Sequence, residues 1–137
     1  MSDNKKIQLL VVDDDEDIVL MMGDFLDATE NSHQFSVITS KSFEESLSII
    51  NNQKPDVLIT DITLPGGSGI LLADSLRSIN PDAFIVIMSG WSKPSDNNDE
   101  LVNKIDAYLK KPFEFDKFDE LITRIAASFN RVTSMSK

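Results

Sequence analysis

Short apolar runs alternate with amphipathic helical patterns along the chain. Residues 7–12 are almost continuously apolar, which is typical of a strand buried on both faces of a parallel sheet. From Ile18 to Leu26, apolar residues recur at the spacing of one helix face. The same unit repeats, with strands predicted at 7–12, 35–39, 57–60, 83–88 and 107–109 and helical faces at 18–26, 43–50, 72–79, 101–105 and 118–129. Five βα units in succession predict an α/β fold, a parallel sheet with helices on both faces.

Three segments are less regular. Residues 91–99 are rich in turn formers, so we expect the helix behind them to be short or mobile. Residues 65–69 (PGGSG) are predicted to form a loop. We expect one domain over residues 1–137, with a core at 7–129 and a frayed tail at 130–137.

Composition narrows the classes of function. The 13 basic and 23 acidic side chains give a net charge of −10, which disfavours direct binding to nucleic acid or to an anionic membrane. With no cysteine and one histidine, disulfides and thiolate zinc sites are excluded and an imidazole-based metal site is disfavoured. No apolar stretch is long enough for a signal-peptide core or a membrane span, so we expect a soluble cytoplasmic protein.

Polar side chains follow four of the predicted strands. Residues 13–15 are all aspartate, Asp61 ends the third strand, Ser89 the fourth, and Lys111 follows the fifth. In open α/β sheets, ligands bind outside the carboxyl ends of the strands. Carboxylates without histidine or cysteine suit a hard cation, Mg²⁺ or Mn²⁺, and an aspartate can act as a nucleophile toward phosphorus. These strand ends therefore point to phosphoryl-transfer chemistry.

Four motifs carry a family resemblance. VVDDD at 11–15, TDITLPG at 60–66, MSG at 88–90 and YLKKPF at 108–113 resemble the receiver domain of two-component response regulators. The likeness runs from about Ile7 to Phe129. It implies a doubly wound, flavodoxin-like sheet with strand order 2-1-3-4-5.

The resemblance also implies roles at the acidic end of the sheet. Asp61 would be the phosphoacceptor, and Asp13 and Asp14 the pair that holds Mg²⁺ together with Asp61. The backbone carbonyl of Thr63 would be a further ligand.

The remaining positions would respond to the phosphoryl group. Ser89 would bond it, and Lys111, rather than Lys110, would pair with its oxygens because Pro112 follows; that Lys-Pro bond is expected to be cis. Tyr108 matches the aromatic residue whose rotamer reports the state of the site.

By the same resemblance, a histidine kinase, a phosphotransfer protein or a small phosphodonor would phosphorylate the chain. The loop after the fourth strand would then move in, and the face formed by the fourth helix, fifth strand and last helix would bind a protein partner. The resemblance leaves two oligomeric states open, a monomer and a phosphorylation-dependent homodimer formed through that face. Beyond its own phosphorylation and dephosphorylation, no enzymatic activity is expected.

Some positions depart from the family pattern. Lys104-Ile105 replace a small pair that is often Gly-Ala, Gly90 stands where alanine is common, and Trp91 is unusually large. We hypothesise that Trp91 shields the acyl phosphate from water and lengthens its life.

Two other functions stay open. A small phosphohydrolase of the haloacid dehalogenase type would use Asp13 as the nucleophile of a D-x-D motif, but it would leave Asp61 without a role. A receiver-like module that binds a partner without phosphorylation is the second. We favour a stand-alone receiver over a fragment of a longer regulator.

Overall fold

A five-stranded parallel sheet forms the centre of the computed structural model, which describes residues 6–90 and 105–135. Its strands are β1 (Ile7–Val12), β2 (Phe35–Ser40), β3 (Val57–Asp61), β6 (Phe84–Ser89) and β7 (Ala107–Lys110). They lie in the order β2-β1-β3-β6-β7. In chain order, β6 and β7 are the fourth and fifth strands of this sheet, so the predicted order 2-1-3-4-5 is confirmed.

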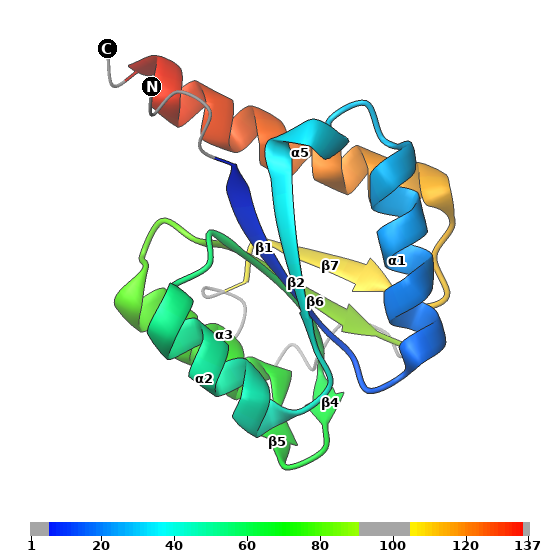
Figure 1. The fold of residues 1–137 in the computed structure, drawn as a ribbon, viewed down its shortest axis with the longest axis vertical. Coiled ribbons are helices and arrows are strands. Elements are labelled where there is room, and N and C mark those ends of the chain that lie inside the picture. The colour runs from blue at the N-terminus through cyan, green and yellow to red at the C-terminus, as the bar shows by residue number, and fades with distance from the viewer. Residues whose placement is uncertain (1–5, 91–104, 136–137) are drawn as a thin grey trace.

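Helices cover both faces of the sheet (Figure 1). The helices are α1 (Glu16–Ala28), α2 (Phe43–Gln53), α3 (Gly69–Ile79) and α5 (Phe115–Met135), with a 3₁₀ turn, η2, at Ser32–Gln34. Figure 1 shows α1 and α5 on one face and α2 and α3 on the other. The predicted fourth helix and Trp91 lie outside the described residues. Within the described part of the chain, no helix has the length and apolar character needed to cross a bilayer.

One apolar layer packs on each face of the sheet, so the central strands are buried on both faces. Leu9 and Val11 of β1 belong to the layer under α1 and α5, whereas Leu10 and Val12 belong to the layer under α2 and α3. All four side chains are nearly or fully buried. This explains why the β1 sequence is continuously apolar instead of alternating.

Side-chain caps fix where two helices begin. Asp15 caps α1 by accepting a hydrogen bond from the Asp17 backbone N–H, at 2.9 Å. Ser42 caps α2 by accepting one from the Glu45 N–H, at 3.3 Å. The Glu45 carboxylate accepts hydrogen bonds from the Ser40 hydroxyl and the Lys41 N–H, at 2.8 and 3.3 Å. The β2–α2 connection is therefore bonded to the first turn of α2.

The structure differs from the sequence prediction at two segments. Residues 65–69 are not a simple loop, because β4 (Thr63–Leu64) and β5 (Gly67–Ser68) pair antiparallel as a short ribbon. α5 continues to Met135, so the tail expected from residue 130 is helical through that residue. Composition indicates neither feature. The ribbon depends on pairing between two short segments, and the last helix continues beyond the apolar face that predicted it.

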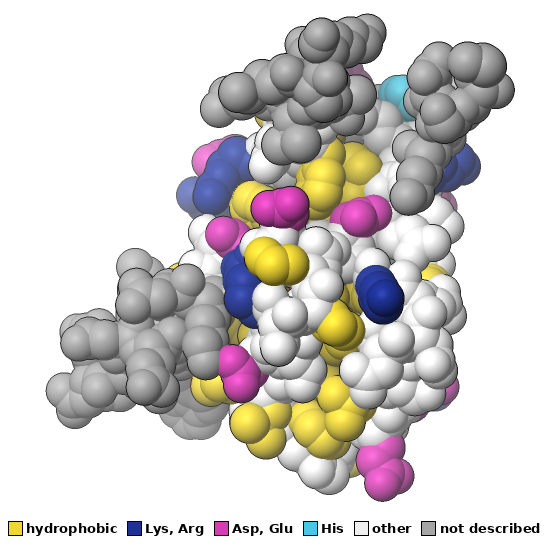
Figure 2. Space-filling model, turned by 90° about the vertical axis from the view of Figure 1, so that its left-hand side faces the viewer, with side chains coloured by type: hydrophobic (Ala, Val, Ile, Leu, Met, Phe, Trp, Pro, Cys, Tyr) yellow, Lys and Arg dark blue, Asp and Glu magenta, His cyan; other side chains and the backbone are white. Residues whose placement is uncertain are grey.

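Asp106 links several elements at the amino-terminal end of the sheet. Its carboxylate Oδ2 accepts hydrogen bonds from the Ile85 N–H and from Arg77 Nη2, both at 2.8 Å. Arg77 also donates to the Pro81 and Ala83 carbonyls. Figure 2 looks onto this end from the left of Figure 1 and shows basic and acidic side chains lying close together among hydrophobic and uncharged ones. The polar contacts at this end are thus structural and lie far from the acidic end of the sheet.

Candidate functional site

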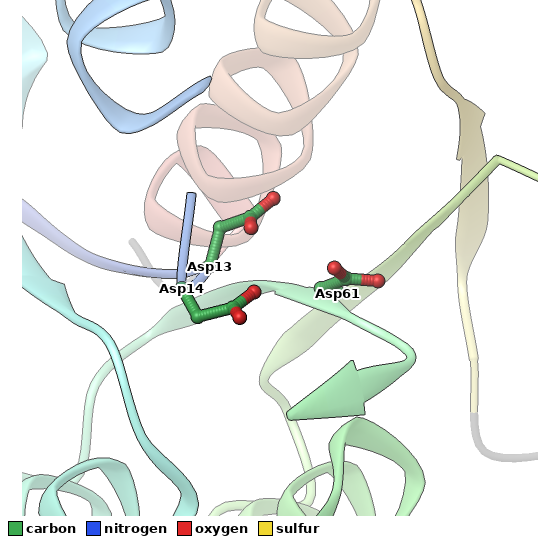
Figure 3. Close-up of side chains that lie close together, drawn as sticks. All are labelled: Asp13, Asp14 and Asp61. Atoms are coloured by element: carbon green, nitrogen blue, oxygen red, sulfur yellow. The ribbon is translucent and has the colours of Figure 1, made fainter. Parts of the chain in front are cut away.

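Strand register brings the predicted carboxylates together. Val12 of β1 pairs with Thr60 of β3, so Asp13 and Asp61 follow at neighbouring strand ends. Carboxylate oxygens of Asp13, Asp14 and Asp61 lie within 4.8 Å of one another. Figure 3 shows Asp13 and Asp14 extending from the end of β1 toward the side on which Asp61 lies.

Asp13 is the most buried of the three, with no exposed surface. Its Oδ1 accepts a hydrogen bond from the Asp15 N–H at 2.9 Å, and its own N–H donates to the Ser40 carbonyl. Oδ2 is buried and forms an ion pair with Lys111 Nζ at 2.8 Å. Burying a carboxylate is costly unless a cation compensates its charge, and here the Lys111 ammonium does so.

Lys111 reaches across the site from the end of β7. Its backbone N–H donates to the Ser89 carbonyl at 2.8 Å, and its Nζ donates to Asp61 Oδ2 at 3.1 Å. Burial would lower the pKa of Lys111, but the carboxylates of Asp13 and Asp61 outweigh it, so the pKa lies above its usual value. Lys110 is exposed on the same strand. The prediction that Lys111, and not Lys110, enters the site is therefore supported by geometry, and the Lys111–Pro112 bond is cis as expected.

The other predicted residues take distinct places. Asp61, Thr63, Ser89 and Lys111 line one hollow of about 550 Å³, and Ser89 is buried at its wall. The Thr63 N–H lies 3.5 Å from Asp61 Oδ1. Tyr108, by contrast, is half-buried against the apolar layer under α2 and α3, and is absent from the residues lining this hollow. The structure thus brings the catalytic and metal candidates together and leaves Tyr108 beside them.

An ion pair at the rim was missed by the sequence analysis. Lys41, from the β2–α2 connection, pairs with Glu16 in the first turn of α1. A hydrogen bond from Lys41 and its charge lower the pKa of Glu16. The sequence places Lys41 after the second strand but gives no signal that its side chain reaches this helix, because that contact depends on how the strands pair.

The donor set fits a hard divalent cation. Three carboxylates converge, with oxygens of Asp13, Asp14 and Asp61 within 4.8 Å of one another. Carboxylate and carbonyl oxygens are the ligands that Mg²⁺ takes in proteins, usually alongside waters and phosphate oxygens. Asp13, Asp14 and Asp61 are therefore the residues that would hold such an ion.

Comparison with known proteins shows which family of proteins this chain is similar to. A family model for the response regulator receiver domain matches residues 9–125. YrkP, an uncharacterized transcriptional regulatory protein of Bacillus subtilis, is 32% identical over 126 residues, covering 92% of this chain and 51% of YrkP. The heme response regulator HssR of Staphylococcus aureus is 32% identical over 125 residues, covering 91% of this chain and 52% of HssR. The chain spans about half the length of these curated relatives.

Solved structures agree on the fold. A CheY-like receiver domain from Methanospirillum hungatei superposes with a TM-score of 0.76 at 22% identity, covering 93% of this chain and 99% of that one. The response regulator TrrA of Thermotoga maritima, whose structure holds Mg²⁺ and BeF, superposes with a TM-score of 0.71 at 28% identity, covering 85% and 96%. The family model matches most of the sequence, which shows that this chain belongs to the response regulator receiver domain family.

Proposed function

We propose that the chain is a phosphorylatable signalling receiver that accepts a phosphoryl group on Asp61 in a Mg²⁺-dependent reaction. The observation that carries the proposal is the position of the Lys111 ammonium, between Asp13 and Asp61 and beside the three-carboxylate cluster. Such a group of charges suits a site that must neutralise a phosphoryl group as it arrives. The donor is a histidine kinase, a histidine phosphotransfer protein or a small acyl phosphate.

The step is a displacement at phosphorus. An Asp61 carboxylate oxygen forms the new P–O bond while the P–N bond of a phosphohistidine breaks, and the departing imidazole nitrogen keeps the electron pair and gains a proton. Lys111 pairs with the phosphoryl oxygens, and the Ser89 hydroxyl donates to one of them. Asp13, Asp14, Asp61 and the Thr63 carbonyl would hold Mg²⁺, which would supply further positive charge.

Burial favours Asp61 over Asp13 as the nucleophile. The Asp61 carboxylate lines the hollow and is 16% exposed, whereas Asp13 is fully buried and its Oδ2 faces Lys111. A donor can therefore approach Asp61 but not Asp13. This argues against the dehalogenase-type phosphohydrolase, in which Asp13 would attack.

Phosphorylation would bias a switch toward the neighbouring face. Ser89 ends β6 and pairs in register with Lys110 of β7, two residues beyond Tyr108. Closing Ser89 onto a phosphoryl group would shift this strand end and the packing of Tyr108, changing the face made by β7 and α5. A downstream protein is the proposed partner of that face; a cytoplasmic location and a phosphorylation-dependent dimer remain predictions.

Intact mass after incubation with acetyl phosphate tests the reaction. The wild type in Mg²⁺ should gain one phosphoryl group, and Asp61→Asn or removal of Mg²⁺ should abolish the gain. Asp24→Asn, which changes an exposed carboxylate of α1, is the matched control and should behave as the wild type.

Two results would contradict the proposal. An adduct that survives Asp61→Asn but not Asp13→Asn would favour the phosphohydrolase. No adduct and no donor consumption, together with no effect of beryllofluoride, would favour the binding module that is not phosphorylated.

A further inference from the structure

The ribbon β4–β5 follows the proposed phosphoacceptor directly and carries Thr63. Each of its strands has two residues, and Thr63 and Leu64 pair with Ser68 and Gly67. A ribbon of this length is too short to be stable by itself. The position of the Thr63 carbonyl must therefore depend on what the ribbon packs against.

Phe43, the first residue of α2, contacts this ribbon at two points. Its backbone N–H donates to the Pro65 carbonyl at 3.2 Å. Its ring fills the space beside Gly67, where an added Cβ would lie 2.5 Å from Cγ and 2.6 Å from Cδ1 of the ring. Gly66 alone takes a positive φ in this turn, at 87°, so Gly67 is required by space and not by its backbone conformation.

Phe43 is itself held to the acidic end of β1. The Ser42 cap starts α2 immediately before Phe43, and Glu45 of the same turn bonds to Ser40 and Lys41. The Ser40 carbonyl in turn accepts the hydrogen bond of the Asp13 N–H, at 3.1 Å. A continuous set of contacts thus runs from Asp13, through the start of α2, to the ribbon after Asp61.

We propose that Phe43 is a positioning residue for Mg²⁺, setting the distance between the Thr63 carbonyl and the carboxylates through its contact with Gly67. This inference rests on the proposed function, because it assumes that the carboxylates and Thr63 bind the ion. Mg²⁺ requires near-ideal octahedral geometry with short ligand distances, so a small shift of one ligand weakens binding. Residues that orient metal ligands typically contribute about 10- to 100-fold in metal affinity.

A double-mutant cycle tests the contact. The Mg²⁺ dissociation constant is measured by isothermal titration calorimetry on the full chain for the wild type, Phe43→Ala, Gly67→Ala and the double variant, with thermal unfolding recorded for each. Phe84→Ala is the matched control, because Phe84 is another half-buried phenylalanine but lies at the amino-terminal end of β6. Phe43→Leu provides a milder variant should Phe43→Ala unfold.

The proposal predicts that Phe43→Ala and Gly67→Ala each weaken Mg²⁺ binding by about tenfold. In the Phe43→Ala background, Gly67→Ala should cost less than about twofold, since the ring that its methyl group would strike is gone. Phe84→Ala should lower thermal stability while leaving the Mg²⁺ dissociation constant within about twofold of the wild type.

Three outcomes would overturn the inference. If Phe43→Ala and Phe43→Leu bind Mg²⁺ as tightly as Phe84→Ala does, Phe43 contributes only to the packing of the core. If the fold-changes in the Mg²⁺ dissociation constant caused by Phe43→Ala and Gly67→Ala multiply in the double variant, the two residues act independently. The contact between them would then not explain either effect. A wild type that binds no Mg²⁺ would overturn the proposed function as well, whereas normal Mg²⁺ binding and Asp61 phosphorylation in all variants would remove this inference alone.

Discussion

Lys111 Nζ lies 2.8 Å from Oδ2 of Asp13, a carboxylate with no exposed surface. The same ammonium donates to Asp61 Oδ2 at 3.1 Å. The lysine therefore occupies, in this structure, oxygens that the proposed Mg²⁺ site would use. Lysine and metal should compete for the same negative charge, and this competition can be measured.

Lys111→Met should strengthen Mg²⁺ binding while weakening the metal-free fold. Removing the ammonium frees two carboxylates, and we expect affinity to rise roughly tenfold, equivalent to about 1.4 kcal/mol. Without metal, the buried Asp13 charge is left uncompensated, and the free energy of unfolding should fall by about 3 kcal/mol. Calorimetric titration and urea unfolding, with and without Mg²⁺, give both quantities.

The neighbouring lysine provides the control. Lys110→Met removes an exposed charge one residue away and should change neither quantity by more than about 0.5 kcal/mol. Equal effects of the two substitutions would mean that general surface charge, and not the Asp13 contact, governs metal affinity.

Stability of the metal-free protein should depend on pH through Lys111. Burial opposes the charged form, but Asp13 and Asp61 outweigh burial, so the pKa of Lys111 is raised above 10.5. A raised pKa means that the folded state holds the proton more tightly, so this stabilisation is complete below about pH 10.5 and is lost as pH rises through the higher value. Urea unfolding in EDTA should show that the difference in the free energy of unfolding between wild type and Lys111→Met becomes smaller above that pH. A difference that stays constant into strong alkali would contradict the assignment.

Gly69→Ala should destabilise the fold although alanine favours helices. A Cβ at this first residue of α3 would overlap the Asp61 carbonyl oxygen and lie 3.0 Å from two side-chain atoms of Thr60. Backbone and β3 would have to move, and we expect a loss of about 1–3 kcal/mol in the free energy of unfolding. Gly23→Ala is the opposite case, because nothing lies within 4 Å of its added Cβ in α1. Its free energy of unfolding should rise by about 0.5–1 kcal/mol in the same urea titration. If the Gly69→Ala protein is as stable as the Gly23→Ala protein, Gly69 does not lie as close to the Asp61 carbonyl as the structure places it.

Asp106→Ala should destabilise the end of the sheet opposite the candidate site. The substitution leaves the Ile85 N–H and Arg77 Nη2 without the carboxylate that accepts from both. An unpaired buried N–H costs about 1–3 kcal/mol, and we expect a loss in that range by urea unfolding. Asp106→Asn keeps an acceptor oxygen and should lose less. Unchanged Mg²⁺ affinity in both variants would place this network outside the metal site, whereas a tenfold change would contradict its purely structural role.

The sequence alone determined the architecture and gave the candidate residues of the site. Continuous apolar runs such as β1 are found where a parallel strand is buried on both faces, and the helical spacing from Ile18 to Leu26 specifies the helix that follows. Both properties are periodic and local, so the order of elements follows directly from them. Motifs at four strand ends were sufficient to name the family, which the comparisons confirm. They also gave Asp61, Asp13 and Lys111 as predicted site residues.

Tertiary structure decided the distances and the partners. Strand register and the twist that brings the strand ends together decide whether Lys111 pairs with Asp13 or with solvent. They also decide whether Lys41 reaches Glu16. The β4–β5 ribbon was not predicted because its strands are too short to carry a periodic pattern and because a ring from a distant helix, Phe43, supplies the missing bulk at Gly67. Such contacts join residues far apart in the chain, and their energies arise only when the packed layers form.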